Sequence, residues 1–160
     1  MIASMTSSVK PMRPINETGQ DVARESEVIW HVKRYFNSLL GGNSEVIEWT
    51  AEKKALAPID CILMRPDTMS MIGLEVKCRT CAIGQYNTYM IAEQKILKMV
   101  KMDIACALVV QWTDALGFLM IDDYPLPGQY RETGGRKDRG QNGDIEMTTH
   151  IPIEHFKIIA

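Results

Sequence analysis

The sequence lacks several features that would place it in a specialised class. No apolar run approaches the roughly 18 residues that a bilayer-spanning helix needs, and residues 1–10 hold no apolar stretch of the kind that a secretory signal contains. The formal net charge is −2, so the broad basic surface of a general DNA-coating protein is not expected. These absences indicate a cytoplasmic protein and still allow an enzyme with a local basic path.

Cysteine is also scarce, and its spacing argues against a zinc site. Cys78 and Cys81 form a single C-x-x-C, whereas a structural zinc site normally needs a second pair at similar spacing. Cys61 and Cys106 lie within apolar runs and are expected to be small core residues. In a cytoplasmic chain all four thiols should be reduced. The core is therefore expected to form without disulfides or structural metal.

What is present suits one ordinary domain. The chain has 160 residues, of which 46% are hydrophobic and 24% charged. Residues 1–16 carry Ser, Thr and Pro without periodicity and predict a flexible arm, which leaves residues 17–160 as a single domain. Apolar periodicity predicts helices over residues 17–40 and 87–102, strands over 45–50, 59–64, 71–78, 105–112 and 118–121, and short elements over 145–149 and 153–159. This order predicts an α/β fold with a small mixed sheet flanked by helices.

Residues 125–143 differ from the rest because they hold five glycines and two prolines, which predicts a long loop. Glycines let a backbone approach a partner closely, and arginine forks match the geometry of phosphate. The loop is predicted to be either a phosphate clamp or a solvated surface segment. Its basic residues are Arg131, Arg136, Lys137 and Arg139.

An acid and a lysine share one face of the predicted strand 71–78. Strand residues two apart point the same way, so Glu75 and Lys77 lie together, while Leu74, Val76 and Cys78 form the core face. A surface salt bridge between Glu75 and Lys77 is the alternative interpretation.

A second acid, Asp60, begins the preceding strand. Together with Asp60, the pair of Glu75 and Lys77 is a stronger indication of a functional site. If the two strands pair through a turn at residues 65–70, Asp60 approaches Glu75. Magnesium usually takes one or two carboxylates together with water and phosphate, and it lowers the pKa of a bound water. An ammonium such as Lys77 could position that water or stabilise charge on the phosphate.

The first helix offers a further acid. Glu25 lies four residues before Ile29 and seven before Val32, so it falls on the apolar stripe of that helix. A buried ionised glutamate needs a cation or a metal as partner. We expect Glu25 to be a further metal ligand, with the solvent-facing Glu27 as the fallback. The alternative is a frayed helix start at which Glu25 reaches water.

These residues form a pattern that resembles the PD-(D/E)XK nuclease superfamily. The resemblance covers about residues 20–112 and rests on A-R-E-S-E-V-I (23–29), P-I-D (58–60) and G-L-E-V-K (73–77). Within the superfamily it is similar to archaeal-type Holliday-junction resolvases and small phage nucleases. Ile59 separates the proline from the acid, and the glycine-rich loop lies outside the shared core.

The resemblance implies a restriction-endonuclease-like core and one or two Mg²⁺ or Mn²⁺ ions. It implies that Asp60, Glu75 and Glu25 bind metal and that Lys77 is the catalytic lysine. It also implies that the backbone carbonyl of Val76 touches the ion. The helix after the lysine strand often lends a polar residue to the site in this superfamily, and Gln94 and Lys95 are the candidates here.

The partner implied is DNA. Tyr86 and Tyr89 could stack on bases or pack in the core, and both interpretations stay open. The predicted nucleic-acid contacts are Arg79, Lys95, Arg131, Arg136, Lys137 and Arg139.

The sequence therefore predicts a magnesium-dependent endonuclease that hydrolyses DNA phosphodiester bonds with a metal-activated water. It would act in the cytoplasm of a bacterial or phage-infected cell, and branched or structured DNA is one substrate class open to it. A symmetric junction would call for a homodimer, because two strands must be cut together. The alternative is a catalytically inactive nuclease fold that binds nucleic acid or regulates a phage process.

Overall fold

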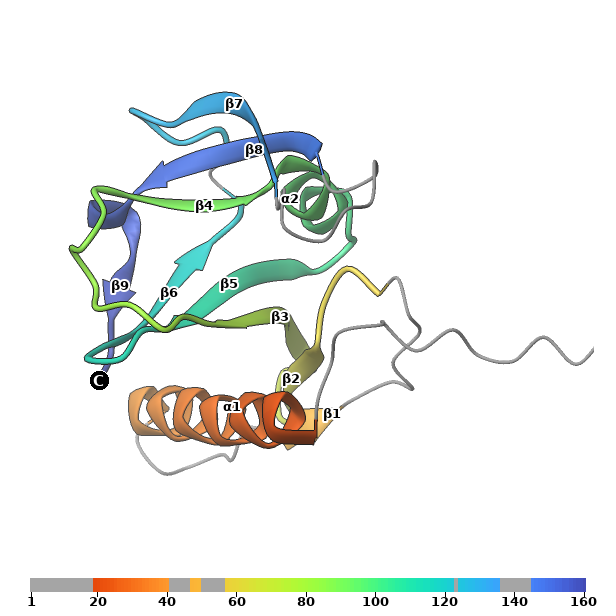
Figure 1. Ribbon diagram of the computed structural model, residues 1–160. Helices are drawn as coiled ribbons and strands as arrows, with labels where there is room; N and C mark the ends of the chain where they lie inside the picture. Colours follow the sequence, from red (N-terminus) through yellow and green to blue (C-terminus); the bar gives the residue numbers. More distant parts are fainter. Residues whose placement is uncertain (1–18, 41–46, 50–56, 123, 136–144) are drawn as a thin grey trace, which may run out of the picture.

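The chain folds into three layers (Figure 1). The computed structural model describes residues 19–40, 47–49, 57–122, 124–135 and 145–160. The described elements, in chain order, are α1 (Gly19–Leu39), β1 (Ile47–Trp49), β2 (Cys61–Arg65), β3 (Ser70–Cys78), β4 (Thr88–Ala92), α2 (Glu93–Val100), β5 (Ala105–Gln111), β6 (Leu116–Met120), β7 (Tyr130–Gly135), β8 (Ile145–Pro152), a 3-10 turn (Ile153–His155) and β9 (Lys157–Ile158).

Two sheets organise these elements. The larger has six strands in the order β1-β2-β3-β5-β6-β9, and the smaller has three in the order β4-β8-β7. Strands β3 and β5 run parallel, whereas the other neighbouring pairs are antiparallel. The connection between β3 and β5 contains both β4 and α2. This architecture confirms the predicted α/β fold with a mixed central sheet flanked by helices.

Helix α1 covers one face of the large sheet. Val28, Ile29 and Val32 are buried against Leu74 and Val76 of β3, as the helical spacing of the apolar residues predicts. None of the helices in the described segments is long and apolar enough to cross a membrane.

Helical spacing extends the predicted apolar stripe from Val22 to Leu39, and it is too long at both ends. Val22 and Leu39 are 50% and 60% exposed, so the prediction that they are buried is wrong. The buried part of the stripe is confined to the middle of the helix, at Val28, Ile29 and Val32.

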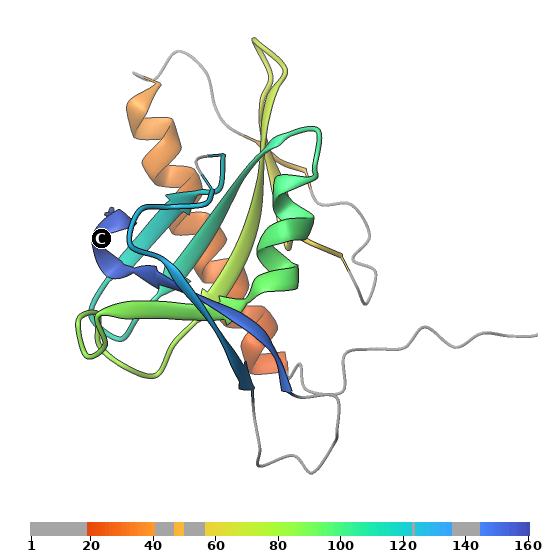
Figure 2. The ribbon, with the colours of Figure 1, turned by 90° about the horizontal axis from the view of Figure 1, so that it is seen from above.

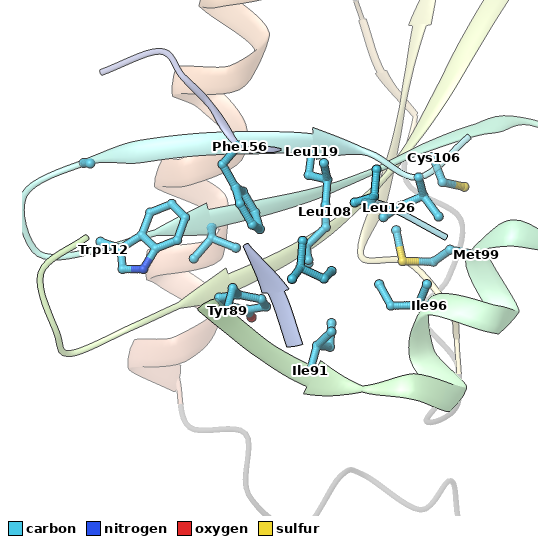
Figure 3. Close-up of a cluster of buried hydrophobic side chains, with 14 residues drawn as sticks. Tyr89, Ile91, Ile96, Met99, Cys106, Leu108, Trp112, Leu119, Leu126 and Phe156 are labelled. Carbon is cyan, nitrogen blue, oxygen red and sulfur yellow. The ribbon is translucent and has the colours of Figure 1, made fainter. Parts of the chain in front are cut away.

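The other face of the large sheet is covered by α2 and the small sheet (Figures 1 and 2). Leu108 on β5 packs in one cluster with Ile96 and Met99 of α2 and with Tyr89 and Ile91 of β4. Figure 3 shows these side chains converging between the layers. Both faces of β3 and β5 are thus covered, as is usual where parallel strands occur.

The predicted helix over residues 87–102 is wrong in its first part. Residues 88–92 form β4 and pair with β8, and α2 begins only at Glu93. Along β4, Tyr89 and Ile91 are buried while Met90 is 43% exposed. This alternation is the period of a strand, and it is stabilised by a partner strand about 60 residues further along the chain.

The predicted loop over residues 125–143 is also wrong in part, because residues 130–135 form the edge strand β7. Residues 136–143, with the predicted DNA contacts Arg136, Lys137 and Arg139, lie outside the described residues. Among the cysteines, Cys61 and Cys106 are buried as predicted, whereas Cys78 is exposed rather than in the core.

Candidate active site

The candidate site lies where β2 ends beside β3. The pairing of these strands stops at Cys61, which faces Leu74, while β3 continues to Cys78 alongside β5. Asp60 occupies the place of the next strand residue. Its backbone N–H donates to the Leu74 carbonyl at 2.7 Å, and its Oδ2 accepts the Val76 N–H at 2.7 Å. The predicted pairing through the turn at residues 65–70 therefore brings Asp60 alongside β3.

Glu75 lies on the face of β3 that α2 covers. It is in register with Leu108 of β5, whose side chain belongs to the cluster between the large sheet, α2 and β4. Its side chain is completely buried, so the salt bridge with Lys77 that the alternative interpretation expected at the surface has its acid inside the protein. An ionised carboxylate in such a place needs positive partners, because desolvation of a charge is costly.

Two ammonium groups supply that charge. Lys77 Nζ lies 2.5 Å from Glu75 Oε1, and Lys95 Nζ lies 3.0 Å from Oε2. Both are ion pairs, although neither carboxylate oxygen has an aligned hydrogen-bond donor in the described part of the chain. Lys95 also donates to the Ala57 carbonyl at 3.1 Å, which ties α2 to the segment before Asp60.

The electrostatics of the pair follow from burial. Burial raises the pKa of Glu75 and Asp60 raises it further, against the lowering effect of Lys77 and Lys95. Burial lowers the pKa of Lys77, but the charges of the Glu75 carboxylate and of Asp60 outweigh this effect. The pKa of Lys77 is therefore raised above its ordinary value. The ammonium thus stays charged at neutral pH, as a group that stabilises an anion must.

A divalent ion fits this donor set. Val76 donates its N–H toward Asp60, and in a strand the N–H and C=O of one residue point to the same side, so the Val76 carbonyl faces the same edge. Asp60, Glu75 and this carbonyl are oxygen donors of the kind that magnesium takes, with water completing its shell. Within the described ranges no three His, Cys, Asp or Glu residues gather as a metal cage, and the side-chain oxygen donors of this set are the carboxylates of Asp60 and Glu75.

Glu25 comes from the opposite side of the sheet. It is half-buried on α1, which covers the Leu74 and Val76 face, and Glu75 lies on the other face. Burial and then the charge of Glu25 raise the pKa of the Cys78 thiol, so Glu25 lies near the end of β3. Its predicted role as a metal ligand stays a prediction.

The fallback acid, Glu27, is exposed. It lines a pocket of about 450 Å³ between α1 and the ends of β3 and β5, together with His31, Arg79 and Gln111. The pocket places Glu27 beyond the end of β3, so the structure does not bring it to the Glu75 face either.

The cations predicted to contact DNA are held by the protein where the structure describes them. Arg79 donates to the Met90 carbonyl at 2.7 Å, and Lys95 is held at Glu75 as described above. Arg131 forms an ion pair with Glu93, the first residue of α2, which is only 6% exposed. DNA contact by these three residues stays a prediction, and each also has a structural partner.

The comparison with known families decides the identity of the fold. A family model described as "Phage putative PDDEXK endonuclease" matches residues 11–159. The chain belongs to this family. No curated protein matches the chain. Membership confirms the resemblance to the PD-(D/E)XK superfamily and places the chain among nucleases, which generally use divalent metal ions.

One feature of the site was not anticipated from the sequence. Lys95 was expected to be a candidate polar residue or a DNA contact, and the structure adds that it pairs directly with Glu75. Of the two interpretations left open for the tyrosines, core packing holds for Tyr89, which is 3% exposed, whereas Tyr86 is 62% exposed. A strand pattern over residues 88–92, with Tyr89 and Ile91 on the inward face, was the signal that could have placed Tyr89 in the core.

Proposed function

We propose that this chain is a metal-dependent endonuclease that hydrolyses DNA phosphodiester bonds by attack of a metal-activated water. One observation carries the proposal: the carboxylates of Asp60 and Glu75 and the ammonium of Lys77 meet where β2 ends beside β3. A protein with a nuclease fold that does not cut would have no need to keep a buried carboxylate such as Glu75 there, because burying its charge destabilises the fold.

The residues of the chain divide the work. Asp60, Glu75 and the Val76 carbonyl would hold Mg²⁺ or Mn²⁺, which supplies a Lewis acid and a water of lowered pKa when bound. Lys77 would hold a proton and a positive charge beside the phosphate and orient the water. Lys95 would keep part of the Glu75 charge balanced from α2. Glu25 is proposed as a further acid that approaches from α1.

The same ion pairs support an alternative, a nuclease fold that binds nucleic acid without cutting it. Both oxygens of Glu75 already lie within 3.0 Å of an ammonium, so an ion must compete with Lys77 and Lys95 for them. The two proposals differ in one observable, since only the enzyme binds a divalent ion at Glu75 and turns over.

A cleavage assay tests the proposal. The protein is incubated with supercoiled plasmid, single-stranded DNA and a four-way junction, with Mg²⁺, Mn²⁺ or EDTA, beside the variant Lys77→Ala. We expect metal-dependent cleavage by the wild type and a loss of about 100-fold or more in the variant, the effect of removing one group that stabilises the transition state. Lys98→Ala, at an exposed position of α2, is the matched control and should cleave normally. No cleavage of any substrate with either metal would support the binding module.

The junction arm also addresses substrate and assembly. Preferred cutting of the junction over linear duplex would assign branched DNA, and it would call for two copies of the chain. Size-exclusion chromatography with light scattering then reports whether a dimer forms. We place the activity in the cytoplasm of a bacterial or phage-infected cell, in keeping with the phage family that matches.

A further inference from the structure

The pocket of about 450 Å³ at the end of β3 lies next to the candidate site and is not used by it. Its lining includes Cys78, Arg79 and Thr80, the three residues that follow Lys77 directly. Pockets of about 300–1,000 Å³ hold ligands of small-molecule size, a class that includes a single nucleotide. The pocket is therefore large enough for one nucleotide, and it begins one residue from the proposed catalytic lysine.

The lining of the pocket suits the parts of a nucleotide. Val28 of α1 gives it an apolar side. Thr80 and Thr113 bring hydroxyl groups, which donate and accept hydrogen bonds, as the edge of a base does. Arg24 adds a positive charge, and a guanidinium matches the geometry of phosphate. Among the described lining residues Glu27 is the single acid.

An exposed tryptophan lies beside this pocket. Trp30 on α1 is 51% exposed, and its ring contacts that of His31 in an edge arrangement at a centroid distance of 4.9 Å. His31 itself lines the pocket, so it connects the two. The guanidinium of Arg34 lies 4.6 Å from the centroid of the Trp30 ring. Tryptophan and arginine are among the residues that most often carry the binding energy of an interface.

The chemistry of this surface favours an unpaired DNA strand as its partner. Sites for single-stranded nucleic acid combine aromatic rings, on which bases stack, with cations that follow the backbone. The guanidinium groups of Arg24 and Arg34 outweigh the single acid Glu27, which fits a polyanion. In a duplex the bases are stacked inside the helix, so a base must be unpaired or extruded before it can reach a tryptophan or a pocket.

We propose that this α1 surface, made of Arg24, Trp30, His31 and Arg34 together with the pocket, binds an unpaired strand of the DNA substrate. One nucleotide occupies the pocket, and a neighbouring base stacks on Trp30. As a statement about the substrate, the inference rests on the proposed function. It names the substrate class as DNA in which an unpaired strand leaves the duplex beside the bond that is cut.

Binding without cleavage tests the inference. The full chain in EDTA is titrated into a fluorescein-labelled thymidine strand of about 12 nucleotides, within the usual site size, and into a duplex of equal length. Fluorescence anisotropy should show the strand bound about 10-fold more tightly or better, because stacked bases add affinity that a duplex cannot. Trp30→Ala should weaken strand binding by about 5- to 100-fold, the loss expected for one stacked base. Trp30→Phe keeps an aromatic ring and should keep most of the affinity.

Two controls separate this effect from a general disturbance. Leu39 is an apolar residue of the same helix and is 60% exposed, so Leu39→Ala should bind the strand as the wild type does. Arg34→Ala should lower the slope of log affinity against log salt by about 0.7, the value for one phosphate contact on a single strand. Lys98→Ala, on the exposed side of α2, should leave the slope unchanged. Equal losses in Leu39→Ala and Trp30→Ala would overturn the inference.

The thiol of Cys78 reports on the pocket itself. Cys78 is exposed and lines the pocket, so a maleimide reagent should modify it, and Cys78→Ser identifies its share of the reaction. A saturating amount of the thymidine strand should protect this thiol, whereas the same amount of duplex should not. An unchanged rate of modification with the strand bound would overturn the placement of a nucleotide in the pocket.

The inference and the proposed function can fail separately. A protein that cleaves plasmid with metal but binds the strand no more tightly than the duplex would overturn the inference alone. Strand binding that depends on Trp30, without cleavage of any substrate by either metal, would overturn the proposed function and support the surface. A protein that binds neither form of DNA would overturn the inference and would leave Trp30 to a partner of another kind.

Discussion

The Asp60 carboxylate takes the position that a neighbouring strand would otherwise occupy beside Val76. One oxygen satisfies a backbone N–H of β3, and the charge of the same group reaches Glu75. Asp60→Asn separates the structural role of Asp60 from its proposed catalytic role, because the amide keeps a hydrogen-bond acceptor for Val76 and loses the negative charge.

Asp60→Asn and Asp60→Ala should therefore differ. With the amide, we expect the metal-free melting temperature to stay near that of the wild type, while Mn²⁺ no longer raises it. Cleavage should fall at least about 100-fold, or roughly 2.7 kcal/mol of transition-state stabilisation. The alanine variant should lose a further 1–3 kcal/mol or so of folding free energy, because the Val76 N–H has no acceptor. Denaturant unfolding and a plasmid assay measure both effects, and equal stability of the two variants would contradict the assignment.

At this scale the sequence predicted much of the site. Strand alternation placed Glu75 and Lys77 on one face, and the turn before β3 brought Asp60 to them. Alternation could not reveal that this face is buried, because the cover comes from β4 and α2. The sequence also could not show on which side of the sheet Glu25 lies: the helical stripe shows that a residue faces the sheet, but it does not show which face of the sheet the helix covers. Its role as a metal ligand stays a prediction.

Among the elements, β4 was the hardest to predict. Its five residues lead directly into α2, and the apolar residues of both together imitate a single amphipathic helix. The strand exists because β8 supplies its hydrogen-bond partners, and pairing between segments so distant in sequence leaves little local signal. The edge strand β7 was also missed, because Gly134 and Gly135 at its end indicated a loop.

Gly134 shows that one of these glycines serves the sheet. A Cβ atom at this position would lie 2.9 Å from Thr148 Oγ1 and 3.0 Å from its Cγ2, and this hydroxyl is held by the Glu132 carbonyl. Gly134→Ala should therefore destabilise the fold by about 1–3 kcal/mol, as overpacking does. Denaturant unfolding measures the change.

Two further variants check this interpretation. Gly19→Ala is the control, because no atom of the described residues lies within 4 Å of its Cβ position and a helical site favours alanine. Combining Gly134→Ala with Thr148→Ala should cost less than the sum of the two single changes. Strict additivity would show that the side chain of Thr148 is not the obstacle.

For the molecule as a whole, the large sheet separates two apolar clusters, and the charged groups of the site lie at their margin. The pKa of Lys77 is raised in the folded protein, after the Glu75 carboxylate has outweighed burial. A basic group with a raised pKa stabilises the fold fully below its ordinary pKa and loses that contribution as the pH rises through the folded value.

Alkaline pH should therefore weaken the metal-free protein through this group. The stability difference between the wild type and Lys77→Met should be constant near neutral pH and should shrink above about pH 10.4, the ordinary pKa of lysine. Thermal melting between pH 7 and 11 measures the difference, and the comparison cancels other groups that titrate alike in both proteins. A difference that grows with pH would contradict the sign of the shift.

The crossover between β3 and β5 has one more consequence. Strand β4 lies within this crossover and pairs with β8. Backbone hydrogen bonds therefore join β4 to the β7–β8 hairpin. Ile151 faces Tyr89 directly across this pairing. Substitutions in the hairpin can thus shift β4 without altering Asp60 and Glu75. Evolution can therefore change the substrate while the proposed catalytic residues stay the same.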